Sequence, residues 1–114
     1  MSKSNLARMR DDFERIHASE KETGGHEVHV EPGGRRVSNI FNKSTAFDQC
    51  LEVPAIPAAA CLLGEIKVHG ANLRDPVRGL GHQQQHVDVP KKFADDWWVL
   101  NAMIMLDDIM VSNG

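Results

Sequence analysis

The sequence contains no long apolar run. None of its 114 residues lie in a run approaching the roughly 20 apolar residues that a membrane-spanning helix needs. The first residues, "MSKSNLARMRDDFERIH", also lack the apolar centre of a secretory signal peptide. We therefore expect a cytoplasmic protein with no membrane partner.

Basic residues and cysteines are also few. The chain has 13 Lys and Arg against 16 Asp and Glu, for a formal net charge of -3. The basic residues are scattered, which argues against nucleic acid as a partner. Cys50 and Cys61 form no Cys-x-x-Cys pattern and lie near no histidine cluster, which favours two reduced thiols in a cytosolic protein.

What remains is typical of one small globular domain. The content is 41% hydrophobic and 25% charged. In "NLARMRDDFERIH", apolar side chains recur at spacings of three and four, which predicts an amphipathic helix. Its apolar stripe is thin, so we expect residues 1–34, this helix and the loop after it, to form an outer appendage.

Two further helices are expected next. Ser44 or Thr45 is a suitable N-cap for a helix that stops before Pro54. "AIPAAACLLG" predicts a second short helix, with Gly64 as its C-terminal cap.

The sequence after residue 64 changes to strand-like patterns. We predict strands at residues 65–73, 85–89 and 97–106, and "HEVHV" upstream could be another short strand. The run 97–106 is almost wholly apolar, which favours a strand buried on both faces, with a buried helix as the alternative. So few strands close no barrel, and 97–106 would have an unpaired edge through which the chain could self-associate.

The segment "QQQHVDVP" places chemistry on one of these strands. Side chains at i and i+2 of a strand share a face, so Gln84, His86 and Asp88 would point the same way. A histidine and a carboxylate are two corners of the 2-His-1-carboxylate triad that binds non-haem Fe(II). The spacing alone is not specific, since an exposed histidine and an aspartate that ends a strand also fit it.

The wider context resembles a known family. "HQQQHVDVPKKFADDWWVLNAMIMLDDIMVSNG" contains Gln-x-His-x-Asp, a loop, an apolar run, Leu-Asp-Asp and Asn-Gly, and "GANLRDP" precedes it. Over residues 35–114 this is similar to the phytanoyl-CoA dioxygenase family of Fe(II)/2-oxoglutarate oxygenases. The resemblance implies an α+β fold, in which N-terminal helices precede a double-stranded β-helix (jelly-roll, cupin-like) barrel that is incomplete here.

The resemblance also implies residue roles. His86 and Asp88 would bind Fe(II), and Asn72 and Arg74 would contact the co-substrate 2-oxoglutarate, although Arg74 also suits a solvated charge. Asn101 is the one polar residue in its apolar run, so its amide needs either a co-substrate carboxylate or a backbone partner. The full set of cofactor-binding candidates is Asn72, Arg74, Gln84, Asn101 and Met103.

The implied reaction is hydroxylation of a small-molecule substrate by O2, coupled to decarboxylation of 2-oxoglutarate to succinate. The family places a second iron-binding histidine and a 2-oxoglutarate-binding arginine further along, whereas no histidine follows His86 here. We therefore expect the N-terminal part of such an oxygenase, inactive alone. Two alternatives stay open: a non-catalytic interaction or assembly module, and a zinc-binding cupin-like domain in which His69 or His82 joins His86 and Asp88.

Overall fold

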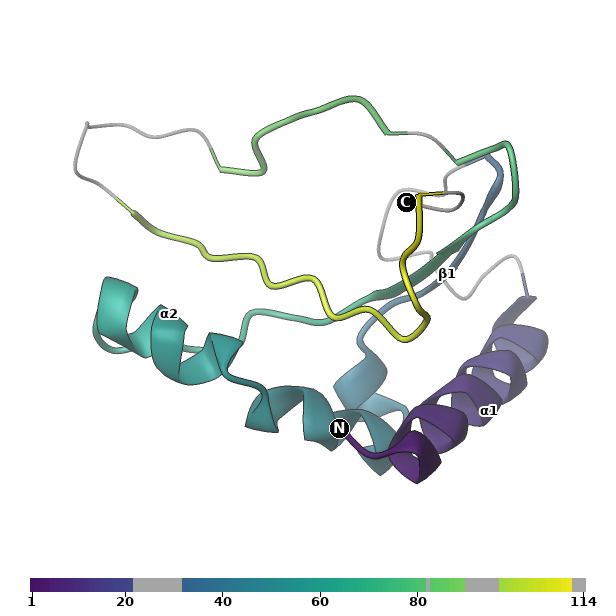
Figure 1. Cartoon of the computed structure of the whole chain (residues 1–114), viewed down its shortest axis with the longest axis horizontal. Coiled ribbons are helices and arrows are strands. Elements are labelled where there is room, and N and C mark those ends of the chain that lie inside the picture. The colour runs from purple at the N-terminus through teal and green to yellow at the C-terminus, as the bar shows by residue number, and fades with distance from the viewer. Residues whose placement is uncertain (22–31, 82, 90–96, 112–114) are drawn as a thin grey trace.

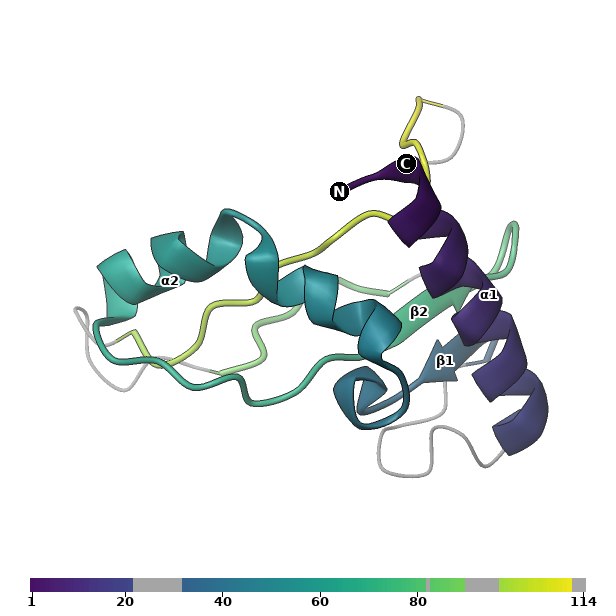
Figure 2. The ribbon, with the colours of Figure 1, turned by 90° about the horizontal axis from the view of Figure 1, so that it is seen from below.

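The computed structural model describes residues 1–21, 32–81, 83–89 and 97–111. Its helices and strands, in chain order, are α1 (Lys3–Glu20), β1 (Gly34–Val37), the 3-10 helices η2 (Ile40–Asn42) and η3 (Thr45–Glu52), α2 (Ala55–Leu63) and β2 (Leu73–Pro76). The strands β1 and β2 pair antiparallel as a two-stranded ribbon. Both views place α1 and α2 at opposite ends of the molecule (Figures 1 and 2).

The helix α1 confirms the helix predicted in the N-terminal sequence. Its N-cap is Ser2, whose hydroxyl accepts a hydrogen bond from the Asn5 N–H at 3.2 Å and so satisfies one of the first free amides of the helix. Three residues of the predicted apolar stripe, Met9, Phe13 and Ile16, are buried. Because these residues recur every three or four positions, they form one continuous face of the helix.

The hydrophobic core lies between this face of α1 and the residues of β1, η2 and η3. Its buried members are Met9, Phe13, Ile16, Val37, Ile40, Ala46 and Phe47. Two segments from later in the chain also reach it, since Leu73 of β2 and Leu106 are partly buried against the cluster. The core is therefore closed mainly by α1, β1, η2 and η3, while the division of the chain at residue 34 stays a prediction.

Arg35 joins α1 to the ribbon by charge. Its Nη1 donates to Glu14 Oε2 on α1 at 2.8 Å, and its Nε donates to Asp75 Oδ2 on β2 at 2.8 Å. The guanidinium also lies over the Phe13 ring, 5.1 Å from its centroid. The Arg35 guanidinium holds the pKa of the Glu14 carboxyl below its ordinary value by hydrogen bonding.

The two helices predicted between residues 44 and 64 are also confirmed. The Ser44 hydroxyl caps η3 by accepting from the Ala46 N–H at 3.0 Å. Gly64 ends α2 with a φ of 79°, in the left-handed region that glycine adopts without strain. In the described part of the chain no single helix is long and apolar enough to span a membrane, and η3 and α2, which pass that test together, are bent by 57° at their junction.

The predicted barrel is wrong. The described residues form a small α+β unit whose sheet is β1 and β2 alone, not an incomplete double-stranded β-helix (jelly-roll, cupin-like) barrel. Of the predicted strands, 65–73 is coil until β2 begins at Leu73, and 85–89 and 97–106 form no strand. Apolar alternation marks side chains suited to a sheet, but a strand forms only where another strand accepts its backbone hydrogen bonds.

The surface area shows how open this arrangement is. The chain exposes 9173 Å², whereas a folded monomer of 12.7 kDa exposes about 6,200 Å². The radius of gyration is 15.3 Å, against about 13 Å expected for a compact domain of this length. Much apolar surface is therefore left in water, and among the later residues it includes Val87, Trp97, Trp98, Val99, Met103, Met105, Ile109 and Met110.

Candidate metal centre

His86 and Asp88 lie together on the exposed segment 83–89. The His86 Nε2 atom is 3.2 Å from Asp88 Oδ1, and the two side chains are 58% and 54% exposed. The segment is coil rather than a strand, so strand alternation does not cause this pairing. The side chains meet because both turn to the same side of an irregular backbone.

The separation of these two atoms fits two ligands of one metal ion. Metal–nitrogen and metal–oxygen bonds to small divalent ions are about 2.1 Å, which puts neighbouring ligands roughly 3.0 Å apart in an octahedron and roughly 3.4 Å apart in a tetrahedron. The observed 3.2 Å between Nε2 and Oδ1 lies between these values. The same separation suits a hydrogen bond between a protonated imidazole and a carboxylate, so either a proton or a metal ion fits between the two atoms.

The other ring nitrogen of His86 is held by backbone. Nδ1 lies 2.8 Å from the carbonyl oxygen of Gln84. A carbonyl oxygen only accepts, so this hydrogen bond requires the proton on Nδ1 and leaves Nε2 with its lone pair in the neutral ring. A lone pair that faces a carboxylate oxygen needs a cation between them, either a proton or a metal ion.

The second oxygen of Asp88 is held by Asn101, which comes from the separate segment 97–111. The Asn101 Nδ2 donates to Asp88 Oδ2, which leaves Oδ1 as the oxygen that faces His86. Metal ligands in proteins are commonly oriented by such outer hydrogen bonds, a carbonyl for the imidazole and an amide for the carboxylate. The partner of Asn101 is thus a carboxylate of the chain itself, and its side chain is exposed rather than buried in a sheet.

The other candidates have contacts elsewhere. Asn72 Oδ1 accepts a hydrogen bond from the Asn39 N–H at 3.4 Å, and Nη2 of Arg74 donates to the Gly81 carbonyl. Met103 is 83% exposed. Gln84 contributes its backbone carbonyl rather than its side chain. The structure therefore brings together His86, Asp88, Asn101 and the Gln84 carbonyl.

A third protein ligand is not found among the described residues. Within residues 1–21, 32–81, 83–89 and 97–111, no group of three His, Cys, Asp or Glu side chains could hold a metal ion. His69 thus completes no such group with His86 and Asp88, and His82 and the "HEVHV" segment lie outside the described residues. The remaining positions on a metal here would be filled by water or by a chelating ligand.

His86, Asp88, Asn101 and Gln84 were candidates from the sequence, and their roles stay predictions; the contacts that hold them were not predicted. The Gln84 carbonyl carries no sequence signal, because every residue has one. The Asn101–Asp88 hydrogen bond could not be predicted from the sequence either, because no strand pairing aligns the two segments that it joins. Comparisons with known proteins found no matching protein family, no matching curated protein and no matching solved structure.

Proposed function

We propose that this chain supplies two iron ligands, His86 and Asp88, of an Fe(II)/2-oxoglutarate-dependent oxygenase of the phytanoyl-CoA dioxygenase type. The observation that carries the proposal is the 3.2 Å separation of His86 Nε2 and Asp88 Oδ1. The motif pattern around these residues supports the choice of this family over other metal-dependent enzymes.

Each residue of the centre has a task. The Gln84 carbonyl keeps the imidazole proton on Nδ1, so that Nε2 can bind metal, and Asn101 occupies one Asp88 oxygen, so that Asp88 binds through the other. Bound iron with 2-oxoglutarate would supply the O2-dependent hydroxylation of a C–H bond in a small molecule. Two protein ligands leave room for 2-oxoglutarate to chelate through a carboxylate and its keto oxygen.

The chain alone should bind metal weakly and turn over nothing. The third protein ligand is not among the described residues, and a centre with one imidazole fewer loses affinity and a fixed geometry. Purified with Fe(II), ascorbate and 2-oxoglutarate, the chain should show no decarboxylation above an iron-only blank. Turnover above that blank would mean that another group completes the centre.

Calorimetric titration of 2-oxoglutarate, with and without Mn(II), tests the proposal. Glutarate is the matched control ligand, since it has the same two carboxylates but no keto oxygen and cannot chelate in the same way. We expect 2-oxoglutarate to bind more tightly when Mn(II) is present and glutarate to show no such gain. Metal and chelator should strengthen each other's binding by the same factor, as linkage requires.

Variants test whether the gain in 2-oxoglutarate affinity depends on His86 and Asp88. His86→Ala and Asp88→Ala should abolish it, whereas His69→Ala, which removes an exposed histidine from another segment, should leave it intact. Equal binding of 2-oxoglutarate and glutarate in the presence of Mn(II), or a gain that survives His86→Ala, would contradict the assignment.

A second function, a non-catalytic interaction or assembly module, is favoured by the exposed apolar surface. The chain exposes 9173 Å², with Trp97 and Trp98 both 65% exposed, and apolar patches of this kind mark interaction sites. Sedimentation velocity over a range of concentrations distinguishes the two. Self-association that is unchanged in the His86→Ala variant and by Mn(II) would favour the assembly module.

A further inference from the structure

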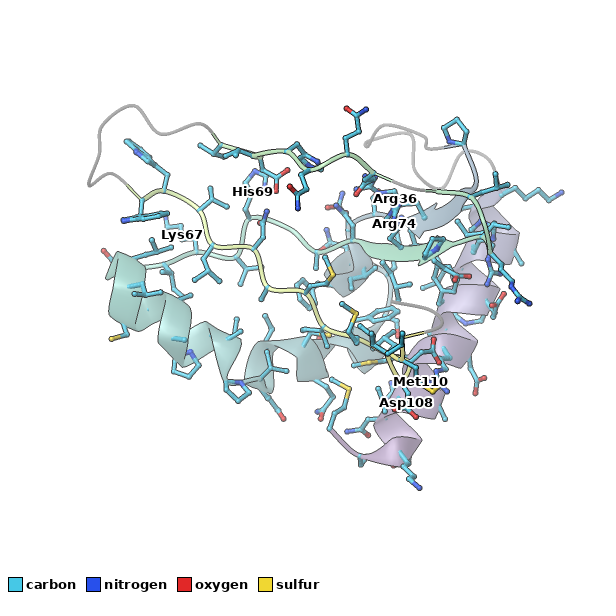
Figure 3. The ribbon with its side chains drawn as sticks, turned by 45° about the horizontal axis from the view of Figure 1, so that its top comes forward. Arg36, Lys67, His69, Arg74, Asp108 and Met110 are labelled. Carbon is cyan, nitrogen blue, oxygen red and sulfur yellow. The ribbon has the colours of Figure 1, made fainter. Side chains whose placement is uncertain are left out.

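Arg10 of α1 holds the segment 97–111 at two neighbouring residues. Its Nη2 donates to the Leu106 carbonyl and lies 2.6 Å from Asp107 Oδ1. Figures 2 and 3 both show the end of this segment beside α1, and Figure 3 labels Asp108 there. One guanidinium therefore contacts a backbone oxygen and a side-chain oxygen of consecutive residues.

The position of Arg10 follows from the packing of α1. Its neighbour Met9 is fully buried, and Phe13, one turn further along the helix, is 5% exposed. These two residues fix the helix on the core, so the backbone at Arg10 is held in place, while the half-exposed Arg10 side chain extends away from the core. The packed first half of the chain thus presents a guanidinium at a fixed place to the later segment.

The contacts of Arg10 differ in kind from the packing of Leu106. The Leu106 side chain is partly buried against the core. Apolar burial is non-directional, so it keeps the segment close to the core without fixing the direction of its backbone. A guanidinium has its N–H donors in a rigid plane, so binding two consecutive residues fixes that direction as well. No regular structure does this instead, since the described residues 97–111 form neither helix nor strand.

The same segment carries the amide that orients the candidate metal centre. Asn101 lies five residues before Leu106, at most about 17 Å away along an extended chain. Asn101 Nδ2 donates to Asp88 Oδ2, which leaves Oδ1 facing His86. A displacement of about 1 Å is enough to break a hydrogen bond, so the placement of the segment decides whether this contact forms.

We propose that Arg10 is a positioning residue for the candidate metal centre, through which the packed first half of the chain holds Asn101 against Asp88. The inference rests on the proposed function, because it concerns the same two metal ligands, and it adds a support that lies far outside their motif. By linkage, a metal ion bound at His86 and Asp88 in turn strengthens the contact of Arg10 with the segment.

Titration of the full chain with Mn(II) tests this role. Arg10→Gln should weaken Mn(II) binding by roughly 3- to 10-fold, less than Asn101→Ala, because Leu106 still packs against the core. The difference between the parent chain and Arg10→Gln should narrow as salt is raised. The ion pair with Asp107 is exposed on both sides and is therefore screened.

Two further variants separate the contact from the charge. Arg15→Gln is the matched control, since it removes the same charge from an exposed position on α1 whose partner is Asp12. Its Mn(II) affinity should stay within about twofold of the parent chain, because a distant surface charge acts only through screened attraction. Arg10→Lys keeps the charge that faces Asp107 but loses the planar donor arrangement, so it should recover part of the affinity that Arg10→Gln loses.

Combination with Asn101→Ala distinguishes positioning from a general loss of structure. Once the Asn101 amide is removed, Arg10→Gln should cause no further loss of Mn(II) affinity, because the connection runs through that amide. Losses that simply add in the double variant would contradict the positioning role.

The metal-free chain gives a readout that does not depend on the proposed function. The NMR resonances of the Asn101 side-chain amide should shift in Arg10→Gln toward their positions in Asp88→Ala, because both changes disturb the same hydrogen bond. A parent chain that binds no Mn(II) would contradict the proposed function, and this shift would still decide the role of Arg10. Unchanged Asn101 resonances in Arg10→Gln overturn the inference and leave His86 and Asp88 as proposed metal ligands.

Discussion

The first half of the chain and its later segments differ in how their backbone N–H and C=O groups are hydrogen-bonded. Every buried hydrophobic residue among those described lies between Met9 and Ala59, whereas residues 83–89 and 97–111 are exposed or half-buried throughout. A helix makes its backbone hydrogen bonds within itself, so α1, η3 and α2 form from local sequence. A strand depends on a neighbour, and the later segments have none among the described residues.

Among the described residues, Arg10 and Leu106 make contacts that join the two regions. Arg10 of α1 donates to the Leu106 carbonyl and forms an ion pair with Asp107 at 2.6 Å, and Leu106 packs against the core. The candidate metal centre lies wholly in the later segments, since its residues come from 83–89 and 97–111. The candidate metal centre is therefore held by hydrogen bonds rather than by a packed scaffold.

The largest difference between the regions should appear in unfolding stability. Phe47 is 1% exposed, and Phe47→Ala should lower the free energy of unfolding by about 3–5 kcal/mol, through lost burial and the cavity left behind. Trp98→Ala removes a larger side chain, but this residue is 65% exposed, so the change should stay within about 0.5 kcal/mol. Urea denaturation followed by circular dichroism measures both.

Equal losses for the two variants would contradict the difference in packing between the two regions. They would mean that Trp98 is packed in solution and that the later segments belong to the cooperative unit. A Trp98→Ala variant that is more soluble than the parent, with unchanged stability, would support an exposed position for Trp98.

A smaller effect is expected from the hydrogen bond that joins the two later segments. Asn101→Ala removes the donor to Asp88 Oδ2 and should weaken Mn(II) binding by about 10- to 100-fold, as is typical when such an outer contact is lost. Met103→Ala is the control, because Met103 is an exposed residue of the same segment and its thioether side chain is not a donor to Asp88. Unchanged Mn(II) affinity in Asn101→Ala would show that Asp88 needs no support.

The same contrast explains what could be predicted from sequence. The helices were predicted because spacing, N-caps and Gly64 are local signals. The ribbon was missed, since "GRRV" has no alternating apolar pattern and its pairing with "LRDP" joins residues some forty positions apart. The barrel failed for the opposite reason: residues 97–106 have the composition of a buried strand, but composition supplies no partner. His86 and Asp88 were singled out because their residue types can be read directly from the sequence, and their role as metal ligands stays a prediction.

The smallest expected effect is a pH dependence of the unfolding stability of the packed first half. The Ser44 hydroxyl, which donates to Asp12, and Arg15 hold the pKa of Asp12 below its ordinary value of 3.8, and Arg35 does the same for Glu14 below 4.5. A lowered folded-state pKa stabilises the fold above the unfolded value, and that stability is lost as pH falls through the folded value. Urea midpoints should therefore fall on acidification below about pH 4.5, and less so in Asp12→Asn. An unchanged slope in Asp12→Asn would contradict this cause.

Paramagnetic broadening by Mn(II) in backbone NMR spectra tests most directly the proposal that His86 and Asp88 bind one metal ion together. At substoichiometric Mn(II), broadening should centre on residues 84–88 and extend to Asn101, which donates to Asp88. The amides of α1 that face the core, such as those of Met9 and Phe13, should remain sharp. The pattern should vanish in His86→Ala. Broadening centred on Asp107 and Asp108 instead, or a pattern that persists in His86→Ala, would contradict the account.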